Sequence, residues 1–334
     1  MQKFFIYITS ALEFYKNART NLDLDLENSD PTKNTLTLRP CSKQPSSDLR
    51  TTKNSIIIED LPYCGNAPFH LLTKNKNYNR HLKNIKFHYS NITYLRNSFL
   101  KYDDNIYIPA PPLLFYQLAT IMPFEQLLQT GLEMCGTYSI SESAVNGYVY
   151  NIPPLTSALK IKTYITNLNK RHKNLPGIRK ALQASSLLID NCASPQESNL
   201  YIKLCAPRNM GGYEISNLKA NCQIKLSEQA REILKHPTIK PDLCNKKTKI
   251  AIEYDSNEFH DNTGQNTKDK LRADALQHDG WKVFTFVSSQ LRDVHSFHNM
   301  AVKILKANKQ EARIRTKNFD TKRRTLWMAL SEQI

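Results

Sequence analysis

The alternation of apolar and polar positions in residues 239–287 predicts a strand, a turn, a second strand, a loop, a helix and a third strand. Residues 250–254 and 283–287 are mostly apolar and β-prone, which is typical of buried strands. The Asn-Lys-Lys sequence at 245–247 indicates the turn before the first of these strands. This stretch is the most strongly patterned part of the chain, and it predicts a small sheet flanked by helices.

Two acidic residues share one face of the strand at 250–255. Successive side chains point to opposite faces of a strand, so Glu253 and Asp255 lie on the same face, roughly 7 Å apart at ~3.3 Å per residue. If the preceding segment pairs antiparallel with this strand, Asp242 falls close to that face. The pattern therefore predicts a cluster of carboxylates.

Clustered carboxylates repel one another and are normally stabilised by a cation, and hard oxygen ligands suit Mg²⁺ or Mn²⁺. Asp242, Glu253 and the backbone carbonyl of Tyr254 are the candidate ligands of one metal ion. Asp255, or His260 in the loop beyond, is a candidate for orienting or deprotonating a water molecule. Such an arrangement suits metal-assisted hydrolysis of a phosphodiester.

A hairpin with a solvated acidic edge is the competing interpretation, because charged residues are common on edge strands. Against it, the Ile-Ala-Ile and Val-Phe-Thr-Phe-Val runs resemble central strands, where an unpaired glutamate is expensive to bury. The residues alone leave both interpretations open.

Composition favours an anionic partner. The formal net charge is +16 and the isoelectric point about 9.4, which is most simply explained by nucleic acid binding. The 7 cysteines form no CxxC pair, so the sequence predicts neither a disulfide framework nor a zinc ribbon and favours a reducing cytoplasm. There is no run of 18 apolar residues, so no membrane partner is expected. A homodimer stays open.

Basic residues also gather in the first half of the chain. Lys83 and Lys86 belong to a stretch at 74–88 that has no acidic residue, and Arg171 belongs to a basic segment at 160–180. Both stretches are candidates for phosphate contacts. Solvated surface is the commoner meaning of a charge run and stays the alternative.

The sequence Ser194-Pro195-Gln196-Glu197 predicts the start of a helix. Serine at the N-cap, proline at the first helical position and Glu197 at the third form a capping box. Further along, the helix expected at 267–278 places Lys268 and Arg272 one turn apart, where they can contact a phosphate or pair with neighbouring aspartates.

The spacing of these residues resembles the PD-(D/E)xK nuclease superfamily, in the branch that includes the very-short-patch mismatch repair endonuclease. The resemblance rests on Pro241-Asp242, Glu253-Tyr254-Asp255, His260, the basic-acidic helix and residues 280–283, Gly-Trp-Lys-Val. It implies a restriction-endonuclease-like mixed sheet and a metal site at Asp242 and Glu253. It also implies that Glu197, on the first helix, is an outer member of that site. The acid-x-Lys element of the superfamily is here acid-x-Asp, and a similar pattern occurs in the RAP domain of RNA-associated proteins.

Residues 112–140, 153–157 and 190–197 are similar to uncharacterised bacterial proteins in which an AbiEi-type abortive-infection regulator region precedes such a nuclease domain. The resemblance implies a role in bacterial defence or mobile-element biology. The predicted organisation is a poorly patterned segment and linker at 1–55, a regulator-like α+β domain at 56–188, the nuclease domain at 189–308 and a basic tail, disordered when free, at 309–334.

The sequence thus predicts an α/β protein and, as its function, a Mg²⁺- or Mn²⁺-dependent DNA endonuclease. In that hypothesis Asp242 and Glu253 bind metal, and Lys268 or Arg272 stabilises charge. The alternative is a non-catalytic regulator that keeps the fold and binds DNA or RNA.

Overall fold

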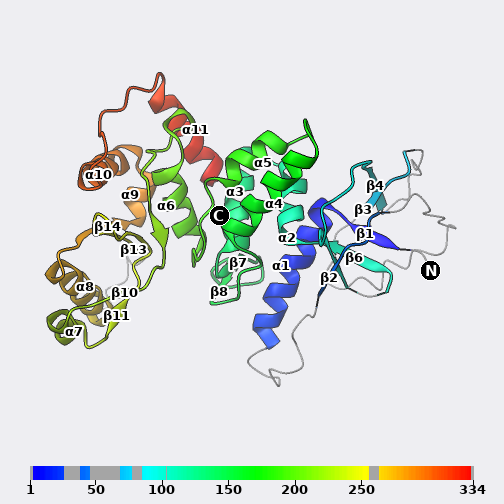
Figure 1. The fold of residues 1–334 in the computed structure, drawn as a ribbon. Helices are drawn as coiled ribbons and strands as arrows, with labels where there is room; N and C mark the ends of the chain where they lie inside the picture. The colour runs from blue at the N-terminus through cyan, green and yellow to red at the C-terminus, as the bar shows by residue number, and fades with distance from the viewer. Residues whose placement is uncertain are drawn as a thin grey trace. The chain divides into compact units, whose positions relative to one another are not determined.

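The computed structural model describes residues 3–25, 38–45, 68–76, 85–102, 104–255 and 263–331, with the side chains of 21–25 and 263–267 left aside. The chain folds into two compact units. The first comprises residues 1–134 and 139–188, and the second comprises residues 135–138 and 189–334. Helices and sheets alternate in both units, which confirms the predicted α/β class (Figure 1).

The first unit is built on a mixed sheet with the strand order β2-β5-β6-β1-β3-β4. Its strands are β1 (Phe4–Ile6), β2 (Arg39–Cys41), β3 (Phe69–Thr73), β4 (Ile85–Tyr89), β5 (Phe99–Lys101) and β6 (Ile106–Pro109). Strand β1 pairs parallel with β6 and antiparallel with β3. The N-terminal segment, which was predicted to lie outside the domains, therefore supplies an interior strand of this sheet. Its short Phe-Phe-Ile run is apolar enough to lie between β6 and β3.

Helices pack beside this sheet. They are α1 (Ile8–Asp25), α2 (Pro111–Ala119), α3 (Phe124–Cys135), α4 (Ala158–Arg171) and α5 (Ile178–Ser185), with the short strands β7 (Tyr138–Ile140) and β8 (Tyr148–Tyr150) between α3 and α4. Helix α2 is almost wholly buried and contacts α1, α4 and α5, so it is the central helix of this unit.

The second unit contains the sheet that the sequence predicted. The strand order is β14-β13-β12-β9, where β9 is Lys219–Ala220, β12 is Leu243–Asn245, β13 is Ile250–Asp255 and β14 is Lys282–Val287. Strands β12 and β13 are antiparallel and β13 and β14 are parallel, so the sheet is mixed. A short hairpin of β10 (Ile224–Lys225) and β11 (Thr238–Ile239) accompanies it.

Helices flank the sheet, as expected. They are α6 (Pro195–Cys205), η2 (Arg208–Met210), α7 (Glu228–Leu234), α8 (Thr263–His278), α9 (Ser288–Arg292), α10 (Val294–Ala307) and α11 (Phe319–Ser331). Helix α8 packs on one face of β13 through Ala275 and Leu276, which join a buried cluster with Ala251, and α7 lies against α8 (Figure 1). Leu271, on the same helix, is 37% exposed and does not join this cluster.

The predicted disorder of residues 309–334 is wrong for the described part of that segment. Residues 319–331 form α11, which contacts α6 (Figure 1). Leu326, Trp327 and Leu330 are buried, and Arg323 is buried with its guanidinium bonded to Asp320 and Tyr213. The apolar residues of this segment recur at helical spacing, and their burial outweighs the effect of the basic residues between them. No helix in the described ranges is long and apolar enough to cross a membrane.

Candidate active site

The β12–β13 hairpin brings Asp242 and Glu253 together. Leu243 pairs with Ile252 in the antiparallel ladder, so the residue before β12 lies beside Glu253, and the predicted antiparallel pairing is confirmed. The Asp242 N–H donates to Glu253 Oε2 at 3.2 Å, and the Tyr254 N–H donates to Asp242 Oδ2 at 2.6 Å. Each carboxylate is thus held by the backbone of the other residue's strand.

The two carboxylates line a cavity of about 540 Å³. Its walls come from the end of β13, from one face of α8 and from β14. They are formed by Asp242, Glu253, Tyr254, Asp255, Lys268, Asp269, Arg272, Ala273, Val283 and Thr285. The acidic residues predicted on the strands and the basic residues predicted on the helix therefore line one cavity. Positively charged side chains thus lie beside the carboxylates.

Arg272 pairs directly with Glu253. Its Nη2 donates to Glu253 Oε1 at 2.9 Å and to the Lys240 carbonyl oxygen at 3.1 Å. The side chains are 35% and 20% exposed, so the pair is partly screened by solvent. Arg272 was expected either to contact a phosphate or to pair with a neighbouring aspartate. It pairs with a carboxylate, but that carboxylate is Glu253 of the cavity and not an aspartate on the helix surface.

Glu197 caps its own helix and also belongs electrostatically to the acidic cluster. The Glu197 N–H donates to Ser194 Oγ at 3.1 Å, and Glu197 Oε2 accepts from the Ala193 N–H at 2.9 Å, so the predicted cap is confirmed. The same oxygen accepts a 2.6 Å hydrogen bond from Asn221 Nδ2. The cavity beside Glu253 has no contribution from Glu197 among its walls.

Burial and mutual repulsion raise the pKa values of all three carboxyl groups. For Asp242 the pKa is well above its ordinary value, because the group is desolvated and because the charges of Glu197 and Glu253 lie near. Burial also raises the pKa of Glu253, against the opposing effect of Arg272, and raises the pKa of Glu197. Negative charge in this cluster is therefore unfavourable without a cation.

The donor set fits a hard divalent cation with few protein ligands. Mg²⁺ is usually held by one or two carboxylates together with substrate phosphates and water, and Asp242 and Glu253 are two carboxylates at the wall of an open cavity. Across the described ranges, no group of three or more His, Cys, Asp or Glu side chains is placed to hold a metal ion. A site here would accordingly rest on the two carboxylates and on a backbone oxygen such as that of Tyr254.

Other candidate residues lie elsewhere. His260 and Lys83 fall outside the described residues. Lys86 is exposed on β4, and Arg171 is exposed at the end of α4, both in the first unit. Their exposure agrees equally with a phosphate contact and with plain solvated surface.

Three features of this region carried no clear sequence pattern. Asn221 positions Glu197, and its backbone N–H donates to the Asp242 carbonyl oxygen at 3.0 Å. Asp269 lines the cavity, and its charge raises the pKa of Glu253. The sequence indicated Asp269 only as a member of the basic-acidic helix and as an aspartate with which Lys268 or Arg272 could pair.

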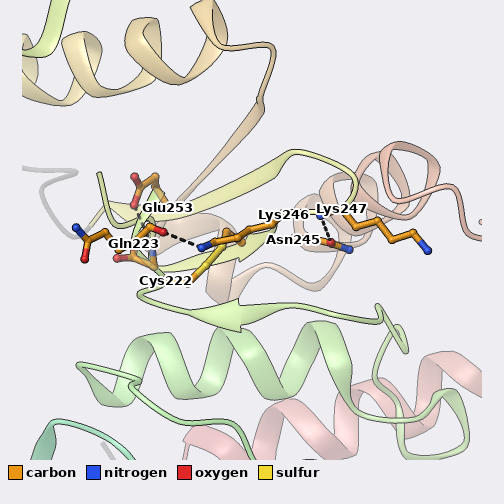
Figure 2. The surroundings of a disulfide bond; sticks show 8 residues. Cys222, Gln223, Asn245, Lys246, Lys247 and Glu253 are labelled. Atoms are coloured by element: carbon orange, nitrogen blue, oxygen red, sulfur yellow. Dashed lines mark hydrogen bonds between the residues drawn. A yellow bond between two sulfur atoms is a disulfide. The ribbon is translucent and has the colours of Figure 1, made fainter. Parts of the chain in front are cut away.

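The third is a disulfide between Cys222 and Cys244, which are 22 residues apart in sequence (Figure 2). Cys244 points to the same face of β12 as Asp242, and Glu253 lies in the surroundings of the bond. The sequence had not indicated a disulfide, because the partners become neighbours only when β12 enters the sheet. The bond also argues against the predicted reducing compartment, where protein disulfides are rare.

The chain matches no protein-family model, no curated protein and no solved structure. The resemblance to nucleases therefore rests on the motif residues in the sequence alone.

Proposed function

We propose that this protein is a metal-dependent DNA endonuclease whose active site is the cavity between β13 and α8. The observation that carries the proposal is the pair of half-buried carboxylates, Asp242 and Glu253, at the wall of a cavity that Lys268 and Arg272 also line. Partly desolvated negative charge with a raised pKa is characteristic of sites that bind a cation or move protons.

In this proposal each residue has one task. Asp242, Glu253 and the carbonyl of Tyr254 hold Mg²⁺ or Mn²⁺, which when bound lowers the pKa of water and neutralises charge on a phosphate. Asp255 is a further ligand or the base that takes a proton from water. Lys268 and Arg272 bind the phosphate and stabilise the charge that develops on it. A role in defence or mobile-element biology remains part of this proposal.

A non-catalytic regulator that binds DNA or RNA is the second candidate. It is favoured by the Arg272–Glu253 ion pair, which neutralises one of the two carboxylates without a metal, and by aspartate at the position where the superfamily has its lysine. The net charge of +16 supports nucleic acid binding in either case.

Cleavage of supercoiled plasmid and of single-stranded DNA with Mg²⁺ or Mn²⁺ separates the candidates. We expect metal-dependent nicking by the wild type and a loss of about 100-fold or more in Asp242→Asn and in Glu253→Gln. Glu232→Gln, an exposed glutamate on α7, is the matched control and should cleave normally. No cleavage by the wild type, with DNA or RNA binding that weakens as salt rises, would favour the regulator.

A further inference from the structure

A second cavity of the same unit, of about 580 Å³, lies beside the other face of β13. Tyr254 borders both cavities, because its backbone contacts Asp242 while its side chain points away from the Glu253 face. The Tyr254 hydroxyl lies 2.9 Å from Ser288 Oγ on this second side. Helices α6, α9 and α11 supply most of the remaining wall, and all of it belongs to the second unit.

Lys203 places a buried positive charge at this cavity. The residue is 8% exposed, and its Nζ donates to the Leu291 carbonyl oxygen at 2.9 Å and lies 4.6 Å from the centre of the Trp327 ring. Burial lowers its pKa to about 8, so the side chain is mostly charged at neutral pH. An ammonium group has three N–H donors, and no aspartate or glutamate is among the described residues that line the cavity. A buried cation without a counterion is expensive, which indicates a bound anion.

Two further cations and an apolar lining complete the site. Arg292 and Arg324 are exposed residues that also line the cavity, from α9 and α11, so they stand where an anion would enter. Leu291 and Trp327 form part of the wall and are buried. The volume lies within the range of pockets that hold small organic ligands, roughly 300–1,000 Å³.

We infer that this cavity is a binding site for a nucleoside monophosphate group, with the phosphate at Lys203, Arg292 and Arg324 and the base against the apolar wall of Leu291 and Trp327. A phosphate alone would satisfy the cations but would leave the apolar wall uncovered, and an apolar ligand would not satisfy the cations. The group could be a free nucleotide or the terminal nucleotide of a strand, because both present the same chemistry.

Binding of AMP and of inorganic phosphate tests this inference without metal ions, so its outcome is independent of the proposed nuclease activity. The chain has 2 tryptophans, and a Trp281→Phe background leaves Trp327, in the cavity wall, as the fluorescent reporter. We expect AMP to change Trp327 fluorescence and to bind at least about tenfold more tightly than phosphate, a difference of about 1.4 kcal/mol.

Lys203→Met removes the charge at similar volume and should weaken AMP binding at least about tenfold, whereas Lys306→Met, on the exposed side of α10, should bind normally. If Lys203→Met does not fold, the exposed pair Arg292→Gln with Arg324→Gln tests the same site and should weaken binding about fivefold or more. Absence of any AMP effect up to about 10 mM, or unchanged affinity in Lys203→Met, overturns the inference.

Oligonucleotides that differ only in a 5′-phosphate distinguish the two sources. Tighter Lys203-dependent binding of the phosphorylated strand identifies a strand end as the ligand, and binding of AMP with equal affinity for both strands identifies a free nucleotide. Either result supports the inferred binding site. If neither AMP nor either of the two strands binds in a Lys203-dependent manner, the inference is overturned.

Discussion

The two faces of strand β13 border cavities that hold charges of opposite sign. On one face, Glu253 lies with Asp242 in an acidic cluster, and on the other, the side chain of Tyr254 borders the cavity of Lys203. The neighbouring residues Glu253 and Tyr254 thus line two different cavities with their side chains, because successive side chains of a strand point to opposite faces.

The two faces are also stabilised differently. The carboxylates have Arg272 and backbone N–H groups as partners, whereas Lys203 has one carbonyl oxygen and the rings of Trp327 and Phe297. Both faces keep charges that destabilise the ligand-free protein, as functional sites commonly do. We therefore expect that neutralising the charge on either face stabilises the ligand-free protein. On the acidic face the change should abolish metal binding, and at Lys203 it should abolish nucleotide binding.

The largest expected effect on stability comes from the disulfide, which lies on the acidic face. Reduction, or Cys222→Ser, should lower the free energy of unfolding of the second unit by about 3 kcal/mol, because the bond closes a loop of 22 residues. Guanidinium unfolding followed by tryptophan fluorescence measures this, since Trp281 and Trp327 both lie in that unit. Cys41→Ser, in the first unit, is the control. Identical unfolding curves for oxidised and reduced protein would show that the bond contributes nothing.

Asp242→Asn should stabilise the metal-free protein by about 2 kcal/mol at pH 7, because it removes a half-buried charge near Glu197 and Glu253. The pKa of Asp242 is raised in the folded state, so its charge destabilises the protein increasingly as pH rises above the unfolded-state value. The gain should therefore fade as pH falls toward about 4.

Thermal unfolding between acidic and neutral pH measures the effect, with Glu232→Gln as the control. Mg²⁺ should stabilise the wild type and leave Asp242→Asn unchanged. A variant that is destabilised at pH 7 and still responds to Mg²⁺ would contradict the description of the acidic face.

Lys203→Met should stabilise the protein by about 1 kcal/mol at pH 7, since methionine needs no counterion. The folded-state pKa of Lys203 is lowered to about 8, so the wild type recovers stability as pH rises from 8 toward the unfolded-state value, and the advantage of the variant should shrink over that range. Chemical unfolding at several pH values, beside Lys306→Met, measures this difference. A constant difference across the range would mean that the ammonium group is not the cause.

The smallest expected effect belongs to Arg272→Gln. The Arg272–Glu253 pair is partly exposed, so its loss should cost about 0.5 kcal/mol. It should also raise the pKa of Glu253 further, because Arg272 opposes that rise more than the Asp242 backbone N–H does. A double-mutant cycle with Glu253→Gln measures the coupling. Coupling above about 2 kcal/mol would show that the pair is a structural ion pair rather than one open to exchange for a metal.

Local pattern predicted much of the acidic face. The turn at residues 245–247 and the β-prone run after it are enough to predict an antiparallel hairpin, and the hairpin is enough to place Asp242 beside Glu253. The capping box at Ser194 and Glu197 was likewise readable, because its hydrogen bonds join residues three positions apart. The resemblance to restriction endonucleases and the domain boundaries remain predictions.

The opposite face was not predictable. Lys203 has the sequence pattern of an ordinary helical lysine, and its burial depends on α9 and α11. Its contact on α9, Leu291, lies 88 positions further along the chain, and Trp327 on α11 lies further still. The pairing of Cys222 with Cys244 and the contact of Asn221 with Glu197 depend in the same way on how β12 enters the sheet.

The sequence by itself determined the α/β class, the β12–β13 hairpin, the capped start of α6 and the residues that make the acidic cluster. These depend on alternation, turn chemistry and capping, which act over a few residues. Only the tertiary structure decided the burial of Lys203, the disulfide and the packing of α11. Each of these depends on the desolvation of a side chain by segments distant in sequence, and a local pattern carries no information about which distant segment will cover it.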